Sequence, residues 1–146
     1  MSFAVDTNIL LYAVNQSSEY HRRANGFVEA RARGTETWAM PWPVLHAFLR
    51  ISTHPAILPH PLTPAQAVGV VDDLLDNPCM LLLSEGDGFW KDYKADILSL
   101  HLKGNAMPDT QIVALLKSNG VTLLYSKDRD FLRFKGIKVI DPLDPA

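Results

Sequence analysis

The sequence predicts a three-layer α/β/α fold with a central, mainly parallel sheet. Short apolar runs at residues 3–5, 79–83 and 121–125 are typical of buried strands, and segments with apolar residues at helical spacing separate them. This alternation is the pattern of parallel strands joined by crossover helices. We expect residues 1–146 to form one domain, which at this length buries roughly two-thirds of its unfolded surface.

The first predicted strand ends in an acid. Asp6 follows the apolar residues 3–5, and apolar residues at helical spacing resume at Ile9, so Thr7 or Asn8 is placed to cap a helix. In an open α/β sheet, ligands bind at the carboxyl ends of the strands. Asp6 is therefore either a capping residue alone or a site residue.

The next elements also follow from spacing and from helix-ending residues. Residues 19–33 have the pattern of an amphipathic helix, which Gly34 ends. Residues 35–40 predict a strand, and residues 42–53 a helix that ends before His54-Pro55, because the residue before a proline avoids helical geometry. The arginines of the first segment form either a solvated face or a contact for phosphates; they are Arg22, Arg23, Arg31 and Arg33.

A capping box opens the following helix. Thr63 and Gln66 lie three residues apart, and Pro64 stands at the first helical position. Residues 79–83 are apolar without alternation, which predicts a strand covered on both faces.

The last part of the chain continues the alternation. Asp87 is placed to cap a helix whose apolar side is Trp90, Tyr93, Ile97 and Leu100. Pro108-Asp109 begins a helix that ends at Asn119-Gly120. Residues 121–125 and 137–140 complete the predicted strands.

Composition excludes several classes of protein. The single cysteine, Cys79, rules out an internal disulfide framework, argues against a cysteine-based zinc site and suits a reducing cytosol. No stretch approaches the ~20 apolar residues that span a bilayer, and the N-terminus shows no export signal. The formal net charge of −2 means that contact with nucleic acid has to rest on local basic patches.

Acidic residues recur where strands end or helices begin. Asp6 follows the first strand, Asp109 lies in the first turn of a helix, and Asp128 and Asp130 follow residues 121–125. Each alone has an ordinary explanation, since acids favour helix N-termini and turns. In a parallel sheet, however, they converge on one edge, where their repulsion requires protons or cations. Oxygen-rich sites of this kind suit Mg²⁺ or Mn²⁺.

Three stretches resemble the PIN domain: residues 5–10 (VDTNIL), residues 104–109 (GNAMPD) with the apolar helix that follows, and residues 124–131 (LYSKDRDF). Residues 42–55 and residues 134–143 narrow the resemblance to the VapC-type toxins of bacterial toxin–antitoxin pairs. The resemblance covers nearly the whole chain, with all blocks in order.

The resemblance implies a cytoplasmic, metal-dependent endoribonuclease that hydrolyses RNA and is inhibited by a cognate antitoxin, with a homodimer expected and no membrane association. Asp6, Asp109 and Asp128 match the ligands of Mg²⁺, for which Mn²⁺ can substitute, and Asp130 is a neighbouring catalytic acid. Two divalent ions about 3.5–4 Å apart would activate water and neutralise the scissile phosphate. The candidate substrate-binding residues are Thr7, Asn8, Arg50, Lys127 and Arg129.

One position departs from the family pattern. Ala47 stands where the family often has a glutamate, and Arg50 lies within reach of a side chain at that position. Without the glutamate, we expect Arg50 to lean into the acidic pocket and to compete with a second metal ion. The alternative function is therefore a PIN-fold protein that binds RNA or an antitoxin with weak or no nuclease activity.

A second alternative is phosphoryl transfer through an aspartyl-phosphate on Asp6. Enzymes of that kind usually need another acid two residues later, where this chain has Asn8. The histidines show no metal-ligand spacing, and no Ser-His-Asp or Cys-His pattern offers a different nucleophile.

Overall fold

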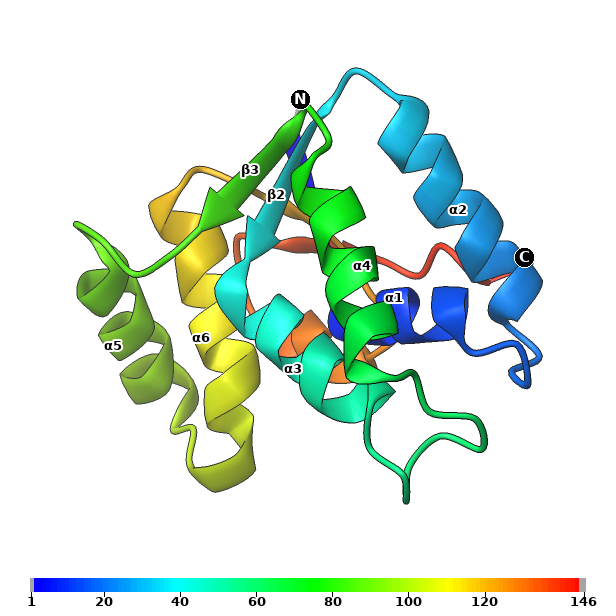
Figure 1. Ribbon diagram of the computed structural model, residues 1–146. Helices are drawn as coiled ribbons and strands as arrows, with labels where there is room; N and C mark the ends of the chain where they lie inside the picture. Colours follow the sequence, from blue (N-terminus) through cyan, green and yellow to red (C-terminus); the bar gives the residue numbers. More distant parts are fainter. Residues whose placement is uncertain (1, 145–146) are drawn as a thin grey trace.

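The computed structural model describes residues 2–144 and contains a five-stranded parallel sheet with helices on both sides (Figure 1). The strand order is β3-β2-β1-β4-β5, and every neighbouring pair is parallel. The strands are β1 (Ser2–Val5), β2 (Thr37–Pro41), β3 (Met80–Leu83), β4 (Leu123–Tyr125) and β5 (Lys138–Ile140). The predicted α/β/α fold is confirmed.

Helices connect the strands in the predicted alternation. In Figure 1, α5 and α6 lie side by side to one side of β2 and β3, and α2 lies on the other side. No helix within residues 2–144 has the length and apolar character needed to cross a membrane. The helices are α1 (Thr7–Val14), α2 (His21–Arg33), α3 (Trp42–Ser52), α4 (Pro64–Leu75), α5 (Phe89–Leu100) and α6 (Met107–Ser118), with short 3₁₀ helices η1 (Gly104–Ala106) and η2 (Arg129–Arg133).

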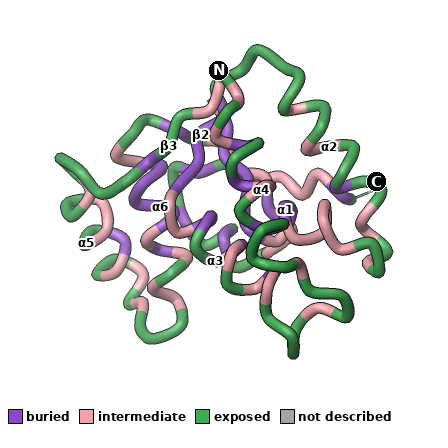
Figure 2. The backbone as a smooth tube through the Cα atoms, in the orientation of Figure 1, coloured by how far each residue is buried: buried purple, intermediate pink, exposed green. Residues whose placement is uncertain are grey.

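The core lies along the central strands, which are the buried segments in Figure 2. Phe3 of β1 and Trp38 of β2 are almost fully buried, and their ring centroids are 5.5 Å apart. Helix α6 contributes Val113 and Leu116, both fully buried. Because helices cover both faces of β1 and β2, these strands are apolar without alternation.

The prediction of a strand covered on both faces is wrong for residues 79–83. Strand β3 forms the edge of the sheet, and its Leu81 and Leu82 are 48% and 36% exposed. Cys79 precedes the strand, with its thiol 3.8 Å from the carbonyl oxygen of Gly34. An apolar run alone does not distinguish a central strand from an edge strand, because the sheet order depends on the crossovers.

Helix caps agree with the sequence in one case and differ in two. The capping box of α4 is confirmed, since Thr63 and Gln66 exchange both hydrogen bonds. The N-cap of α1 is Asp6, whose carboxylate accepts from the Thr7 amide, so its interpretation as a capping residue is confirmed and the placement of the cap at Thr7 or Asn8 is wrong. The N-cap of α5 is Gly88, whose φ of 86° favours glycine, rather than Asp87.

Two smaller differences concern positions along the chain. The predicted strands other than the first begin one or two residues later in the structure, at Thr37, Met80, Leu123 and Lys138. Trp90, predicted on the apolar side of α5, is 61% exposed.

Candidate active site

The candidate site lies at β1, where the order in which the chain adds strands to the sheet reverses. From β1, the chain crosses to β2 and then β3 on one side, whereas β4 and β5 pair on the other side of β1. The ends of β1 and β4 are joined by the Asp6 amide, which donates to the carbonyl oxygen of Tyr125 at 2.9 Å. Parallel sheets bind ligands at this kind of switch point, because the two connecting segments diverge there.

Asp6 is the most deeply buried acid of the site, at 7% exposure. Its carboxylate accepts hydrogen bonds from the Thr7 amide at 2.8 Å and from the Ser126 hydroxyl at 2.7 Å. Burial raises the pKa of Asp6 and the charge of Asp128 raises it further, whereas the hydrogen bonds from Ser126 and Thr7 lower it. Within residues 2–144, no cationic side chain forms an ion pair with Asp6. This carboxylate is therefore held rigidly and lacks a neutralising partner.

Asp109 lies in the first turn of α6 and is partly buried. Burial raises its pKa to about 6, and the negative charges of Asp6, Asp128 and Asp130 add to the increase. The positive charge of Arg133 acts in the opposite direction. A carboxyl group in this environment favours the arrival of a proton or a cation.

Asp128 and Asp130 are positioned by the turn after β4. The Asp128 amide donates to the Ser126 hydroxyl at 3.0 Å, and the Asp128 carboxylate accepts from the Asp130 amide at 2.9 Å. One carboxylate oxygen from each of Asp109, Asp128 and Asp130 lies within 4.8 Å of the others. The turn therefore directs two acids toward the N-terminus of α6.

This donor set fits a hard divalent cation. The cluster of Asp109, Asp128 and Asp130 offers only carboxylate oxygens, which Mg²⁺ and Mn²⁺ prefer. Asp6 lies beside the cluster and acts on Asp109 through its charge, although it is not one of the three acids whose oxygens lie within 4.8 Å of one another. Asp128 and Asp130 remain open to solvent, as an exchangeable ion requires.

The other predicted residues lie in different surroundings. Thr7 donates to the carbonyl oxygen of Val44 at 3.2 Å and so joins α1 to α3. The side-chain oxygen of Asn8 is buried without a hydrogen-bond partner in the described part of the chain. Arg50 is exposed and forms no ion pair within residues 2–144, so the expectation that it leans into the acidic pocket is wrong.

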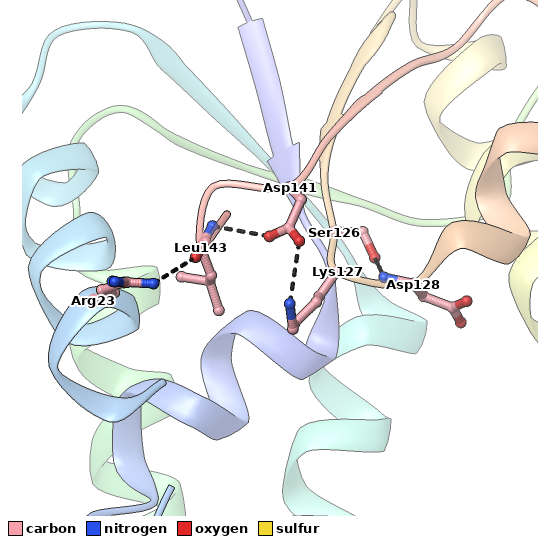
Figure 3. A network of polar contacts seen from close by, with 6 residues as sticks. All are labelled: Arg23, Ser126, Lys127, Asp128, Asp141 and Leu143. Atoms are coloured by element: carbon pink, nitrogen blue, oxygen red, sulfur yellow. Dashed lines mark hydrogen bonds and ion pairs between the residues drawn. The ribbon is translucent and has the colours of Figure 1, made fainter. Parts of the chain in front are cut away.

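Lys127 turns away from the acid cluster. Its amine donates to Asp141 at 3.3 Å and lies 4.3 Å from the centre of the Tyr20 ring. Figure 3 shows the Lys127 amine directed toward Asp141 and the Asp128 carboxylate pointing away from this pair. Lys127 and Asp128 line a cleft of about 660 Å³, and the exposed Arg129 lines the same cleft.

The sequence did not single out Ser126 as a site residue, and it offered Arg133 only as one of the basic residues beside the last acids that can contact phosphates. The Ser126 hydroxyl binds Asp6 and the Asp128 amide at once, and Arg133 is the cation whose charge acts on Asp109. Ser126 could have been predicted, because a serine that follows a strand and precedes an acid by two residues often hydrogen-bonds the backbone of the turn. The place of Arg133 depends on how η2 packs, which no local pattern reports.

The family model for the PIN domain matches residues 3–137. The chain is 34% identical to "Ribonuclease VapC48" of Mycobacterium tuberculosis over 142 residues, 97% of this chain and 98% of that protein. It is 31% identical to "Ribonuclease VapC43" of the same organism, over 96% of this chain and 95% of that protein.

Solved structures show the same fold at low sequence identity. VapBC-1 of nontypeable Haemophilus influenzae has a TM-score of 0.70 at 14% identity, covering 99% of this chain and 100% of that chain. VapC20 of Mycobacterium tuberculosis, a sarcin–ricin loop cleaving toxin, has a TM-score of 0.67 at 13% identity, covering 92% of this chain and 98% of that chain.

Proposed function

The chain belongs to the PIN-domain family, with VapC ribonucleases among its relatives, and from this premise we propose that it is the metal-dependent endoribonuclease toxin of a toxin–antitoxin pair. The observation that carries the proposal is the approach of Asp109, Asp128 and Asp130 to within 4.8 Å beside the buried Asp6. Hydrolysis of a phosphodiester requires an activated water and positive charge on the phosphate oxygens.

Asp6, Asp109 and Asp128 would hold the divalent cation, which is Mg²⁺ with Mn²⁺ able to substitute, and Asp130 would assist as a neighbouring catalytic acid. When bound, the cation supplies a nucleophilic water and neutralises negative charge on the phosphate. Ser126 and Thr7 keep the Asp6 carboxylate in one orientation through their hydrogen bonds.

The basic residues of the turn and of η2 supply the remaining charge. Arg133 lowers the cost of ionising Asp109. Arg129 is exposed next to Asp128 and is suited to a phosphate contact. Lys127 reaches a phosphate only after release from Asp141, so we assign it a weaker role.

The proposal includes a cytoplasmic location, where the RNA substrates are, a cognate antitoxin and a homodimer. The VapBC structures among the neighbours of this fold support the protein partners. VapBC2 of Rickettsia felis, a structural neighbour bound to a promoter DNA fragment, has a TM-score of 0.67 at 18% identity.

Removal of the metal tests the proposed function directly. We expect the purified protein to cleave structured RNA with Mg²⁺ or Mn²⁺, to stop in EDTA and to recover when the metal is restored in excess. A chromogenic phosphate monoester should not be hydrolysed, which separates the nuclease from the phosphoryl-transfer alternative. RNA cleavage that continues in EDTA would contradict the proposal.

The alanine at position 47 tests how many ions bind. Ala47 is partly buried in α3, whose first turn contacts Thr7 through Val44. We expect Ala47→Glu to strengthen a second Mn²⁺ binding event in calorimetric titration and to raise cleavage at limiting Mn²⁺, because it adds a carboxylate beside the cluster. Ala95→Glu, on an exposed position of α5, is the matched control. Unchanged stoichiometry and cleavage in a folded Ala47→Glu variant would show that position 47 does not face the site.

A further inference from the structure

A second hollow lies at the same edge of the sheet, beyond the ends of β2 and β3. It has a volume of about 350 Å³, within the range of small-molecule sites. Three elements line it: the start of α3, the segment after β3, and α6. The lining residues are Trp42, Pro43, His46, Glu85 and Gln111.

The hollow adjoins the candidate active site through α3 and α6. Gln111 follows Asp109 by two residues in α6, about 3 Å along the helix axis but on a different face of the helix. Trp42 directly follows β2, the strand that pairs with β1, and the first turn of α3 accepts a hydrogen bond from Thr7, the neighbour of Asp6. Because the hollow and the acid cluster share α6 and the same edge of the sheet, we expect one RNA strand to contact both.

Two aromatic side chains form one wall. The Trp42 and His46 rings are stacked, with centroids 5.5 Å apart and planes inclined by 24°. His46 is exposed and lines the hollow, so its ring is accessible to a base. Proteins recognise unpaired RNA bases by stacking them on such side chains.

The lining also carries a defined set of hydrogen-bonding groups. The Gln111 amide donates to Glu85 Oε1 at 2.7 Å, which orients both side chains. Within residues 2–144, Glu85 Oε2 and the second amide hydrogen of Gln111 have no other partner. The pair thus offers Glu85 Oε2, the remaining lone pair of Oε1, one amide hydrogen of Gln111 and the Gln111 carbonyl oxygen.

Of the four RNA bases, only guanine can engage both carboxylate oxygens and the free amide hydrogen at once through its Watson–Crick edge. Its Watson–Crick edge presents two adjacent N–H donors, which match the carboxylate, and a carbonyl oxygen, which matches the amide. Adenine and cytosine place a ring-nitrogen acceptor next to their amino group, and uracil places carbonyl oxygens on both sides of its N–H. We propose that Trp42, His46, Glu85 and Gln111 form a guanine-binding subsite that selects the RNA sequence at the cut. This inference rests on the proposed ribonuclease function.

Binding in EDTA tests the subsite without cleavage. The probes are fluorescent hexauridylates with one guanosine, with inosine in its place, or with neither, measured by anisotropy. We expect guanosine to bind best and inosine, which lacks the amino group, to bind about tenfold more weakly, because a hydrogen bond to a charged acceptor is lost. Equal binding of the three probes would overturn the proposal.

Variants assign the preference to individual residues. Glu85→Gln should remove the difference between guanosine and inosine, whereas Glu19→Gln, an equally exposed loss of charge, should keep it. His46→Ala should weaken all probes by about tenfold through lost stacking and leave the preference intact. A Glu85→Gln protein that still distinguishes guanosine from inosine would contradict the assignment. Since these measurements need no metal, they remain decisive even if the wild type fails to cleave RNA.

Discussion

Asp109→Asn is expected to abolish the rise in melting temperature that Mg²⁺ or Mn²⁺ produces in the wild-type protein. A metal that binds only the folded state stabilises it in proportion to its affinity. That affinity depends on the Asp109 carboxylate, which lies within 4.8 Å of those of Asp128 and Asp130. Thermal denaturation with and without metal measures the effect.

The same substitution should stabilise the metal-free protein at neutral pH. The pKa of Asp109 is raised to about 6, first by burial and then by Asp6 and Asp128, so its ionisation works against folding above that pH. Asparagine removes this penalty, which we put at about 1–2 kcal/mol after allowance for solvent screening. Asp72→Asn, on an exposed position of α4, is the control. It should change neither the metal-dependent rise in melting temperature nor the stability of the metal-free protein.

The stability of the metal-free protein should decrease with rising pH where Asp109 ionises. Between about pH 4 and pH 6, the folded protein holds the Asp109 proton more tightly than the unfolded chain does, so the free energy of unfolding falls as pH rises through this window. Metal competes with that proton, and metal stabilisation should therefore grow as pH rises through about 6. A metal-dependent melting shift that persists unchanged in Asp109→Asn would contradict the shared site.

Asp6→Asn is expected to reduce RNA cleavage at least about 100-fold. Loss of a residue that only supports a metal ligand costs up to about 100-fold in metal affinity or activity, and loss of a proposed ligand should cost no less. Asparagine keeps the size of the side chain, accepts the Thr7 amide and remains a good N-cap, so α1 should be preserved. Only the negative charge is lost. Single-turnover cleavage at saturating metal measures the effect on chemistry.

The metal-free Asp6→Asn protein should be no less stable than the wild type. The Asp6 carboxylate is buried, and burial raises its pKa while no cation within residues 2–144 pairs with it. Replacing a buried, unpaired charge with a neutral group removes a cost. Urea denaturation of both proteins in EDTA checks this. Robust cleavage by folded Asp6→Asn would place the active site elsewhere.

Local patterns predicted most of the elements and the place of each acid in the chain. The apolar residues 3–5, the capping box at Thr63 and the acid at 109 depend on neighbours close in sequence, so the sequence alone determined them. Parallel topology followed from the alternation of strands and helices, and it implied that acids at strand ends share one edge. That Asp6, Asp109 and Asp128 lie at one edge of the sheet could therefore be predicted from the sequence.

The tertiary structure alone decided which groups meet. Ser126 and Asp6 are 120 residues apart in sequence, and their hydrogen bond exists because β4 pairs with β1. The exposure of β3 depends on its place at the edge of the sheet. The action of Arg133 on Asp109 depends on where the fold places η2 relative to the start of α6. Glu85 and Gln111 meet for the same reason, across 26 residues. Helical and strand periods report only which face of an element is apolar, whereas contacts between elements depend on how crossovers place whole faces against one another.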